Sequence, residues 1–562
     1  MKKNVQCLLP LITLLLLSLF NAGCTGTPAS STESTPLIAT PSIGYAATLR
    51  VTDTYVPIPT EGTKVVSIWI DPEIRYHPYL ENLAIPDAYL GENKAESNFW
   101  IEIEKESNKP TEIIYEDFFV LAVPFVNQTK NVSYENLKKT WMQNSQSQKQ
   151  ILWIYPEDEI NFEKIFEGKP GSQVISSIEK PDQCEDDNCW KLINFNHIDP
   201  EWRVVTIDNQ SPLNSDFDAS QYKLIFRVYL NQNENQTEEM SLPIIMERQT
   251  NFDPDLLTSV LMTGTTAMVR NTAAQIEQMG ADFPSKNLKW LFDTINITHV
   301  SNEVSFYSDC PPAIPVRKEM RFCSDPGYIE VLKRMGVDVV ELTGNHLLDW
   351  GPDAFLETLT IYEENGIQTY GGGRTIEEAE KPLVIEHNGN KIAFLGCNLP
   401  GPENNWVSDD RPGSLACHLD ELAETISTLR EEGINPIFTF QHNEFNTFRA
   451  TQQMRDDFWQ MANAGAVIVS GSQAHYPQGI DFVNSSFIHY GLGNFLFDQM
   501  YTYWGMATID VHYFYGNQYI NTHQYPIINE NFGQPRLMNE EEAALLLDKI
   551  YASSFYYLAE NP

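Results

Sequence analysis

Basic residues are scarce in this sequence, and the shortage limits which partners the protein can bind. The 562 residues include 37 lysines and arginines against 76 aspartates and glutamates, which gives a formal net charge of −39. Nucleic acids and anionic membrane surfaces attract basic protein surfaces. The composition therefore argues against nucleic acid as a partner and against an anionic membrane surface as the main one. A polyanionic substrate would need a local cationic or metal-filled cleft.

An apolar run long enough to cross a bilayer is also missing from the N-terminus. Two lysines precede the run Leu8–Phe20, which is too short for a spanning helix and has the length of a signal-peptide core. Small residues then lead into Cys24, and the pattern resembles a bacterial lipoprotein signal. We expect residues 1–24 to be this signal, with Cys24 as the lipid attachment site, and residues 25–48 to be a flexible tether. The protein is then extracytoplasmic, anchored to the bacterial cell membrane by its lipid, or secreted if Cys24 is not lipidated.

The cysteines include no C-x-x-C pair, which makes zinc binding a weak explanation for them. Outside the signal segment they form pairs of near neighbours along the chain, and such a set suits disulfides in an oxidising compartment. Spacing alone leaves the connectivity open, and nearest-neighbour pairing is our working hypothesis. The residues concerned are Cys184, Cys189, Cys310, Cys323, Cys397 and Cys417.

The chain is too long for one hydrophobic core, and its pattern changes along its length. Residues 49–250 mix β-like runs with helical stretches, which indicates a separate α+β domain of unknown function. Residues 251–525 alternate strands with helices and carry polar loops after the strands, as is typical of a layered α/β domain. In it, we expect 486–490 and 495–497 to form a closing pair of strands. Residues 526–562 are expected to form a helical tail.

Unusual polar residues follow successive strands of the predicted α/β domain. The apolar run Val337–Leu342 is interpreted as a buried strand, Gly344-Asn345-His346 follows it, and Pro352–Glu364 has a helical pattern. Asparagine and histidine can bind a metal or a phosphate-like group, although Gly-Asn-His alone is also an ordinary turn sequence. Ligands bind at the carboxyl ends of strands in open α/β sheets, so one edge would gather these loops into a cleft. The other loops are Gly264–Thr266, Asn302–Glu303, Gln441–Glu444, Gly471–His475 and His489–Asn494.

Six motifs occur in order between about Leu257 and Gln499. They are Ser301–Glu303, Gly344–Gly351, Tyr370–Ala379 with Lys381-Pro382, Lys391–Gly396, Gly465–Gly471 through His475, and His489–Phe495. This set resembles the CapA, or poly-γ-glutamate capsule biosynthesis, family within the calcineurin-like metallophosphoesterase superfamily. The resemblance implies a four-layer α-β-β-α sandwich of metallophosphoesterase type, preceded by the separate α+β N-terminal domain. It also implies a metal cleft at the strand ends.

Three substitutions separate this sequence from the metal-binding pattern of the family. Thr265 stands where the family has a metal-binding aspartate, Gln441–Glu444 replaces a His-Trp-Gly-x-Glu motif, and Gln473 replaces the first histidine of Gly-x-His-x-His. Hydroxyl and amide groups are weaker ligands for these cations than carboxylate and imidazole. The resemblance therefore implies at most one divalent metal, Mn, Fe or Zn, and argues against a dinuclear site.

The resemblance also suggests a role for each polar residue of the cleft. His346 matches a general acid or phosphate contact, and Arg270 either offers positive charge to an anionic group or is an ordinary helix residue. Whether His442 or Gln441 takes the place of a lost ligand stays open. The metal candidates are Glu303, Asn345, His442 and His475, and the substrate-binding candidates are Thr265, Gln441, Glu444, Gln473 and Asn494.

These observations leave several functions open. The leading hypothesis is a surface-anchored CapA-like protein in capsule or poly-γ-glutamate-type polymer biosynthesis, whose cleft, if active, is a metallophosphoesterase-like hydrolase. The alternative is a non-catalytic lipoprotein that binds a polymer or glycan with a degenerate metal cleft. A third is a binding module dominated by the N-terminal domain. The predicted partner is a cell-envelope polymer or its biosynthetic machinery, and the membrane is contacted through the lipid anchor.

Overall fold

The computed structural model describes most of the chain after its N-terminal segment. The described residues are 48–50, 66–75, 77–81, 84–86, 88–103, 111–144, 150–233, 248–315 and 320–555. The predicted signal peptide, Cys24 and the tether lie outside these residues, so those expectations stay predictions. None of the helices in the described ranges is long and apolar enough to cross a membrane.

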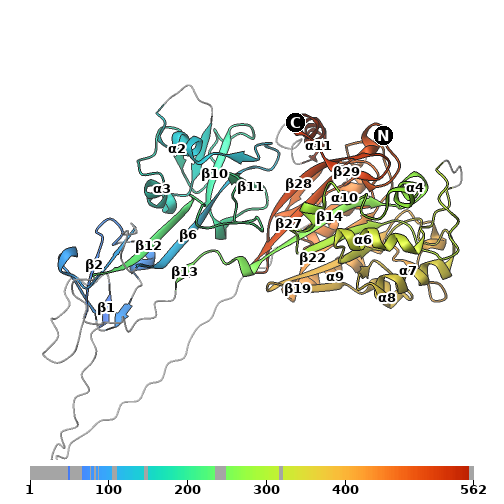
Figure 1. Ribbon diagram of the computed structural model, residues 1–562, viewed down its shortest axis with the longest axis horizontal. Coiled ribbons are helices and arrows are strands. Elements are labelled where there is room, and N and C mark those ends of the chain that lie inside the picture. The colour runs from blue at the N-terminus through green and yellow to red at the C-terminus, as the bar shows by residue number, and fades with distance from the viewer. Residues whose placement is uncertain are drawn as a thin grey trace, which may run out of the picture.

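The first part of the N-terminal domain is a lobe built on one sheet, drawn mostly in blue in Figure 1 with β12 in green. Its strands run in the order β4-β2-β5-β12-β6, and β12 pairs with the first half of β6 in antiparallel fashion. A short helix, α1 (Pro78–Glu81), follows β2. The strands are β2 (Val66–Ile70), β4 (Ala88–Leu90), β5 (Phe99–Glu102), β6 (Thr111–Pro124) and β12 (Ile225–Gln232); β1 (Thr48–Arg50) pairs with β3 (Ala84–Pro86) nearby.

The second lobe begins where β6 changes partners. From Phe119 onward β6 pairs with β10 and β11, whereas up to Phe118 it pairs with β12. The helices α2 (Tyr134–Met142) and α3 (Glu159–Ile165) pack on this lobe, and Ser133 accepts a hydrogen bond from Asn136 N to cap α2. The strands are β7 (Asn131–Val132), β8 (Ile151–Ile154), β9 (Val174–Ser176), β10 (Cys189–Asn194) and β11 (Trp202–Ile207). The strand β13 (Gln249–Thr250) pairs with Tyr115 and Glu116, in the part of β6 that belongs to the first lobe.

The C-terminal domain contains two main sheets, green to red in Figure 1. The first has the order β17-β16-β15-β14-β27-β28-β29, with β14 to β17 parallel and β27 antiparallel to β14. Its strands are β14 (Leu257–Thr266), β15 (Ile297–Asn302), β16 (Val339–Glu341), β17 (Gln368–Tyr370), β26 (Asn494–Leu496), β27 (Met506–Tyr515), β28 (Gln518–Glu530) and β29 (Gln534–Leu537).

The second sheet has the order β19-β20-β22-β23-β25-β24, with β20, β22, β23 and β25 parallel. Its strands are β19 (Leu383–His387), β20 (Asn390–Asn398), β22 (Asn435–Gln441), β23 (Ile468–Ser470), β24 (Ile480–Val483) and β25 (Ser486–His489); a separate pair joins β18 (Gly372–Gly373) to β21 (Gly413–Ser414). The helices of the domain are α4 (Arg270–Met279), α5 (Lys289–Phe292), α6 (Ile329–Met335), α7 (Pro352–Glu364), α8 (Ile376–Glu380), α9 (Leu419–Glu431), α10 (Gln452–Ala464) and α11 (Glu540–Ala552).

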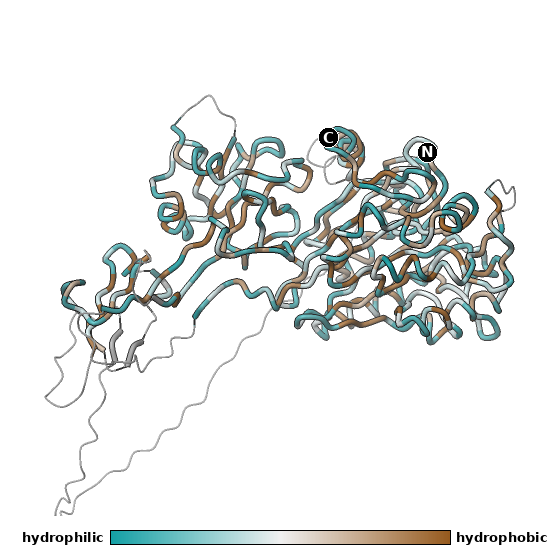
Figure 2. Tube along the Cα trace, viewed as in Figure 1, coloured by the Kyte–Doolittle hydropathy of each residue, from teal (hydrophilic) through white to brown (hydrophobic). Residues whose placement is uncertain are grey.

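Apolar side chains separate the layers of this domain into distinct cores. Met262 and Val339 of the first sheet pack with Phe394 and Ile468 of the second, so the two sheets face each other. Residues of α6 and α7 cover the outer face of the first sheet, and residues of α9 and α10 cover the second. In Figure 2 hydrophobic segments run along the strands, whereas the peripheral loops are mostly hydrophilic. The protein is thus a mixed α/β protein with several sheets, as predicted.

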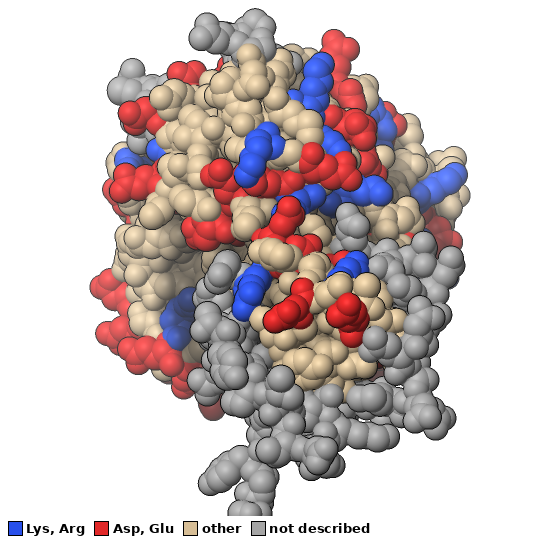
Figure 3. Space-filling model, turned by 90° about the vertical axis from the view of Figure 1, so that its left-hand side faces the viewer, with Lys and Arg blue, Asp and Glu red and all other residues tan. Residues whose placement is uncertain are grey.

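The two domains are joined by direct contacts between β11 and β28. Val204 N donates to Asn521 Oδ1 (3.2 Å), and Asn521 Nδ2 donates to Trp202 O (2.8 Å). Phe125, just after β6, has its ring centroid 5.3 Å from that of Phe487 in the C-terminal domain. The face of the molecule turned toward the viewer in Figure 3 carries acidic side chains interspersed with basic ones.

The structure changes two expectations about strands. The predicted closing pair does not form, because β25 joins the second sheet whereas β26 pairs with β14 of the first. The predicted boundary at residue 525 falls inside β28, so the segment after it completes the first sheet before α11 begins. Tyrosines and asparagines in β27 and β28 obscure the alternating apolar pattern there.

The nearest-neighbour disulfide pairing is confirmed. Disulfides join Cys184 to Cys189, Cys310 to Cys323, and Cys397 to Cys417. Disulfides persist in oxidising compartments, so these bonds indicate an extracytoplasmic protein.

Candidate metal centre

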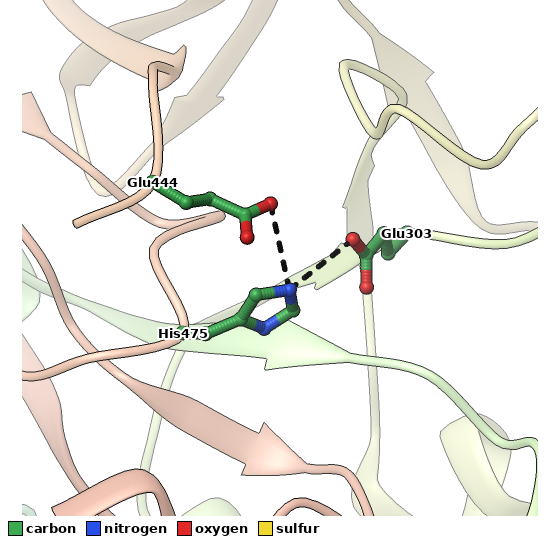
Figure 4. A group of neighbouring side chains, drawn as sticks. All are labelled: Glu303, Glu444 and His475. Carbon is green, nitrogen blue, oxygen red and sulfur yellow. Dashed lines mark ion pairs between the residues drawn. The ribbon is translucent and has the colours of Figure 1, made fainter. Parts of the chain in front are cut away.

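Three side chains converge at the carboxyl ends of parallel strands. Glu303 follows β15, Glu444 lies in the loop after β22, and His475 lies in the loop after β23. Figure 4 shows His475 Nε2 between the two carboxylates, 3.6 Å from Glu303 Oε1 and 3.6 Å from Glu444 Oε1. One ligand atom from each residue lies within 4.8 Å of the others. The two sheets thus contribute to one cluster.

Glycine at position 344 allows the loops to approach this closely. A Cβ atom at Gly344 would lie 2.6 Å from the Cα of Glu303, a distance that real Cβ atoms do not adopt. Asn405 holds the same loop from the other side, because its Nδ2 donates to Gly344 O (2.7 Å) and its Oδ1 accepts from Leu348 N (2.8 Å). The loop after β16 is therefore fixed against the backbone that carries Glu303.

Glu303 is buried without a hydrogen-bond donor. Its side chain is 1% exposed, and neither carboxylate oxygen has a hydrogen-bond partner among the described residues. Burial raises the pKa of Glu303, while the nearby rings of His475 and His346 partly oppose the rise. A buried carboxylate normally needs donors or a cation to offset its desolvation. Glu303 therefore has the environment expected of a residue that binds a cation.

His475 is oriented by an amide on its far side. Asn494 Nδ2 donates to Trp504 O (3.0 Å), which leaves Asn494 Oδ1 to accept from His475 Nδ1 (2.7 Å). The Nε2 atom of His475 therefore points its lone pair toward the carboxylates. The ring also stacks on Phe497, with centroids 5.4 Å apart. Metal-binding histidines are commonly held in this way by a hydrogen bond to the other ring nitrogen.

His346 lies beside the cluster and is paired with an aspartate. Its Nδ1 atom is 2.8 Å from Asp349 Oδ2, and that oxygen also accepts from Phe322 N (2.7 Å). Burial lowers the pKa of His346, but the hydrogen bond to Asp349 and the charges of Glu303, Asp349 and Glu444 outweigh it, and the pKa is raised overall. The histidine is thus favoured in its protonated form, with Nε2 not engaged by Asp349.

Several neutral polar groups in the strand-end loops also lack partners. Both polar atoms of the Gln441 and Gln473 side chains are buried without hydrogen bonds to described residues, as are Thr265 Oγ1 and Asn345 Oδ1. Unsatisfied buried polar groups are rare in folded proteins and often belong to binding sites. These four residues were all predicted as cleft residues, and the polar atoms named above have no hydrogen-bond partner among the described residues.

Two predicted site residues are already engaged elsewhere. His442 accepts from Asn443 N at Nδ1 (2.8 Å), and its Nε2 is 2.9 Å from Asp457 Oδ2, so both ring nitrogens have partners. Arg270 contacts both oxygens of Asp498 through Nε (3.1 and 3.2 Å), and Asp498 balances its charge. His442 therefore does not join the cluster, and Arg270 does not offer a free charge to it.

The sequence analysis did not identify the aspartates that pair with His346, His442 and Arg270. Asp349 is three residues after His346, a spacing that was visible in the sequence and would have suggested the pair. Asp457 lies on α10 and Asp498 follows β26, and only the fold brings them to His442 and Arg270. Glu444 was predicted as a substrate contact, and the structure places it beside Glu303 and His475.

Two carboxylates and one imidazole form a donor set suited to a divalent metal. Zinc, manganese and iron all accept oxygen and imidazole nitrogen ligands. The fold and the site together define a mixed α/β protein with a metal-competent cluster at the carboxyl ends of its parallel strands.

Comparison with known proteins identifies the relatives of this region. The family model described as "Bacterial capsule synthesis protein PGA_cap" matches residues 259–499. The chain is 25% identical over 254 residues to the PGA biosynthesis protein CapA of Bacillus subtilis (strain 168), which covers 45% of this chain and 66% of that protein. It is 25% identical over 190 residues to the capsule biosynthesis protein CapA of Bacillus anthracis, which covers 33% of this chain and 46% of that protein. The resemblance predicted from the sequence is confirmed, and the matched region is a distant relative of the CapA capsule-biosynthesis family.

The match does not extend over whole proteins. The chain spans less than two thirds of the length of the curated relatives named above. Among solved structures, the NAD nucleotidase NadN of Haemophilus influenzae is 12% identical with a TM-score of 0.30, covering 53% of this chain and 64% of that one. A TM-score at this level supports no conclusion about fold or activity.

Proposed function

We propose that this protein is a surface-anchored, CapA-like component of capsule or poly-γ-glutamate-type polymer biosynthesis, with one divalent metal in its cleft. The observation that carries the proposal is the convergence of Glu303, Glu444 and His475 within 4.8 Å at the strand ends. The family relationship of residues 259–499 supports the polymer assignment. The two facing sheets with helices outside them support the metallophosphoesterase type of sandwich.

The residues present fit one metal and not two. Glu303 supplies a buried carboxylate without donors, His475 an oriented imidazole, and Glu444 an exposed carboxylate. The other predicted positions hold the neutral groups of Thr265 and Gln473, which are weak ligands for a second cation. When bound, a divalent metal polarises the bond that is cut and makes water a stronger nucleophile.

His346 is the group that can supply a proton in such a cleft. Asp349 holds its Nδ1 side, and the hydrogen bond to Asp349 together with the nearby carboxylates raises the pKa of His346, which favours the proton-carrying form. A general acid of this kind protonates the leaving group of a phosphoester or amide. Asp349 acts on the reaction only through His346, by holding the ring and its charge.

The neutral amides near the cluster suit a polymer backbone. Gln441 and Gln473 can each donate and accept, and neither has a partner among the described side chains and backbone groups. A poly-γ-glutamate chain offers amide groups to such side chains, while its negative charges would be drawn to the metal. Because the protein is acidic overall, an anionic polymer can be attracted only by positive charge within the cleft.

The alternative proposal is a non-catalytic protein that binds a polymer or glycan with this cleft. Engagement of His442 by Asp457 favours it, because one predicted ligand is withdrawn from the site. In that case the metal or the orphaned amides would serve binding alone.

The test is metal content followed by activity. The purified protein that starts after Cys24 would be loaded separately with manganese, iron and zinc, dialysed, and measured by elemental analysis. We expect about one metal per chain in the wild type, about none in His475→Ala, and an unchanged value in the matched control His442→Ala. Hydrolysis of a generic phosphodiester and of a γ-glutamyl amide would then be assayed with the same proteins.

The outcomes separate the proposals. Metal that is lost in His475→Ala, together with hydrolysis that is lost in the same variant, supports the hydrolase. Metal without hydrolysis of either substrate supports the binding protein. A wild type that retains no metal contradicts the metal site and removes the enzyme proposal.

A further inference from the structure

A cavity of about 390 Å³ lies where the second lobe of the N-terminal domain meets the C-terminal domain. The second lobe contributes β11 and the loop between β6 and β7, and the C-terminal domain contributes β28, the end of β29 and α11. The hydrogen bonds of Asn521 in β28 to the backbone of β11 join the two domains at Val204, which lines the cavity. The interface between the domains therefore forms the cavity, and neither domain forms it alone.

The charged side chains that line this cavity are basic. They are Arg203 of β11 and Lys130 of the loop before β7, and no aspartate or glutamate is among the described lining residues. Neither basic side chain forms an ion pair with a described carboxylate. Asp548, next to the lining residue Leu547, accepts a hydrogen bond from Gln128 Nε2 (2.6 Å) and does not line the cavity. In a protein with a net charge of −39, this cavity is a local exception.

Arg203 uses only part of its guanidinium to hold the loop beside it. Its Nη2 atom donates to Thr129 O (2.8 Å) and to Asn127 O. The Nε and Nη1 atoms have no hydrogen bond to a described residue, and neither is sealed from solvent. Burial lowers the pKa of Arg203, and the groups that oppose this effect are the hydroxyls of Tyr551 and Tyr525, which line the same cavity. The guanidinium is thus fixed in place with donors left over for a ligand.

The rest of the lining includes a continuous apolar contribution from the C-terminal domain. Leu537, Met538 and Leu547 supply it from the end of β29 and from α11. His523 adds no charge, because its Nε2 atom donates to Val204 O (2.9 Å). Burial, and then the charge of Arg203, lower the pKa of His523 to about 3, so the ring is neutral. The cavity combines cationic donors with apolar side chains.

We propose that this interdomain cavity binds a small organic carboxylate with an apolar body. The carboxylate accepts from the donors of Arg203 that the loop leaves unused, and Lys130 adds positive charge at the edge of the site. The apolar body packs on Leu537, Met538 and Leu547. Hydrogen bonds between a guanidinium and a carboxylate are charge-assisted and strong. Small-molecule sites are often mainly apolar cavities at domain interfaces with a few polar groups.

Other ligand classes fit this cavity less well. Inorganic phosphate is compact and would leave the apolar side chains without a contact. A cation would face Arg203 and Lys130 with no carboxylate among the described lining residues to offset their charge. A neutral ligand would leave the partly buried guanidinium without a counter-charge. The proposal does not depend on the function proposed for the C-terminal cleft, because no residue of the Glu303 cluster lines this cavity.

The experiment is calorimetric titration at pH 7 of the purified protein that starts after Cys24. The protein is first treated with EDTA, so that no carboxylate can bind a metal at the Glu303 cluster. The probes are hexanoate, benzoate and cyclohexanecarboxylate, the neutral counterparts are hexanamide, benzamide and cyclohexanecarboxamide, and inorganic phosphate represents a simple anion. We expect at least one carboxylate to bind and none of the amides.

Two variants locate the binding. Arg203→Gln should weaken carboxylate binding by at least about tenfold, and Lys130→Gln should weaken it by a smaller factor. Lys223→Gln removes an exposed lysine of the same domain that does not line the cavity, so it is the matched control and should leave binding unchanged.

The result is interpreted only for variants whose circular dichroism and melting match the wild type. Carboxylate binding that is lost in Arg203→Gln supports the site, and binding that this variant leaves intact overturns it. If Arg203→Gln misfolds, Lys130→Gln decides in the same way, because the lysine is exposed. The proposal is also overturned if none of the three carboxylates binds, if carboxylates and amides bind equally, or if phosphate alone binds.

Discussion

Glu303 and Glu341 lie at the ends of neighbouring parallel strands, and their surroundings are opposite. Glu341, the last residue of β16, accepts a hydrogen bond from Thr343 Oγ1 (2.5 Å) and another from Ser472 Oγ. Glu303, just after β15, has no donor for either oxygen among the described groups. Burial raises the pKa of both carboxyl groups. The comparison suggests that Glu341 serves the fold, whereas Glu303 is kept available for a ligand.

The strongest test of this difference is to neutralise Glu303 and Glu341 in separate variants and to measure the metal affinity of each. Glu303→Gln should weaken Mn²⁺ binding by about 100-fold or more, equivalent to about 2.7 kcal/mol, because the amide is a poor ligand. Glu341→Gln should change the affinity less than about threefold, since its partners are hydroxyl groups of the protein. Calorimetric titration with Mn²⁺ measures both. Equal losses in the two variants would show that Glu303 has no special role.

The free energy of unfolding should respond in the opposite order, with the larger loss at Glu341 and the smaller at Glu303. Glu341→Leu leaves the hydroxyl groups of Thr343 and Ser472 without their acceptor, and we expect a loss of about 2 kcal/mol in the free energy of unfolding. Glu303→Leu removes an unsatisfied buried carboxyl group, so we expect a loss below about 1 kcal/mol or a gain. Urea unfolding of the metal-free proteins checks this prediction. A larger loss at Glu303 than at Glu341 would mean that both residues are structural.

The pairing of His346 with Asp349 gives a pH-dependent prediction. Asp349 helps to raise the pKa of His346, so Asp349→Asn should lower that pKa, which NMR titration of the metal-free protein measures. His346 is a proton donor only below its pKa, so the alkaline limb of any hydrolase activity should move to lower pH. Turnover on this alkaline limb should fall about tenfold. An unchanged pKa in the variant would show that Asp349 does not control the histidine.

The smallest effect is expected at Asp158, the residue before α3 in the N-terminal domain. Burial raises its pKa to about 7 in the folded protein, so its ionised form disfavours folding, and stability falls as pH rises from about 4 to 7. Asp158→Asn should therefore raise the free energy of unfolding by about 1 kcal/mol at pH 8 and leave it nearly unchanged at pH 4. Urea titrations at the two pH values test this. A destabilised variant at pH 8 would show that the charge of Asp158 supports the fold.

Much of the C-terminal domain could be predicted from the sequence because its local patterns agree with its tertiary structure. Pro352–Glu364 forms a helix with the predicted bounds, since a proline at its first position and apolar spacing mark it. Glu303 and His475 were predicted through motifs that occupy the ends of buried strands. The strands β27 to β29 were missed because their antiparallel pairing depends on partners far apart in the sequence and their residues alternate poorly.

Side-chain partnerships were the part that the sequence did not reveal. His442 and His475 look alike as ligands in the sequence, and only the fold places Asp457 against one and Asn494 against the other. The same holds for Asp158, which the fold buries with its Oδ2 atom lacking a hydrogen-bond partner among the described residues. Such contacts are set by tertiary packing and leave no periodic signal in the chain.

The most direct measurement is anomalous X-ray scattering from crystals of the manganese-loaded protein. We expect a single peak bound by Glu303, Glu444 and His475 at about 2.0–2.2 Å from their ligand atoms. A peak at another position, a second peak beside Thr265 and Gln473, or no peak after loading would contradict the assignment of one metal to this cluster.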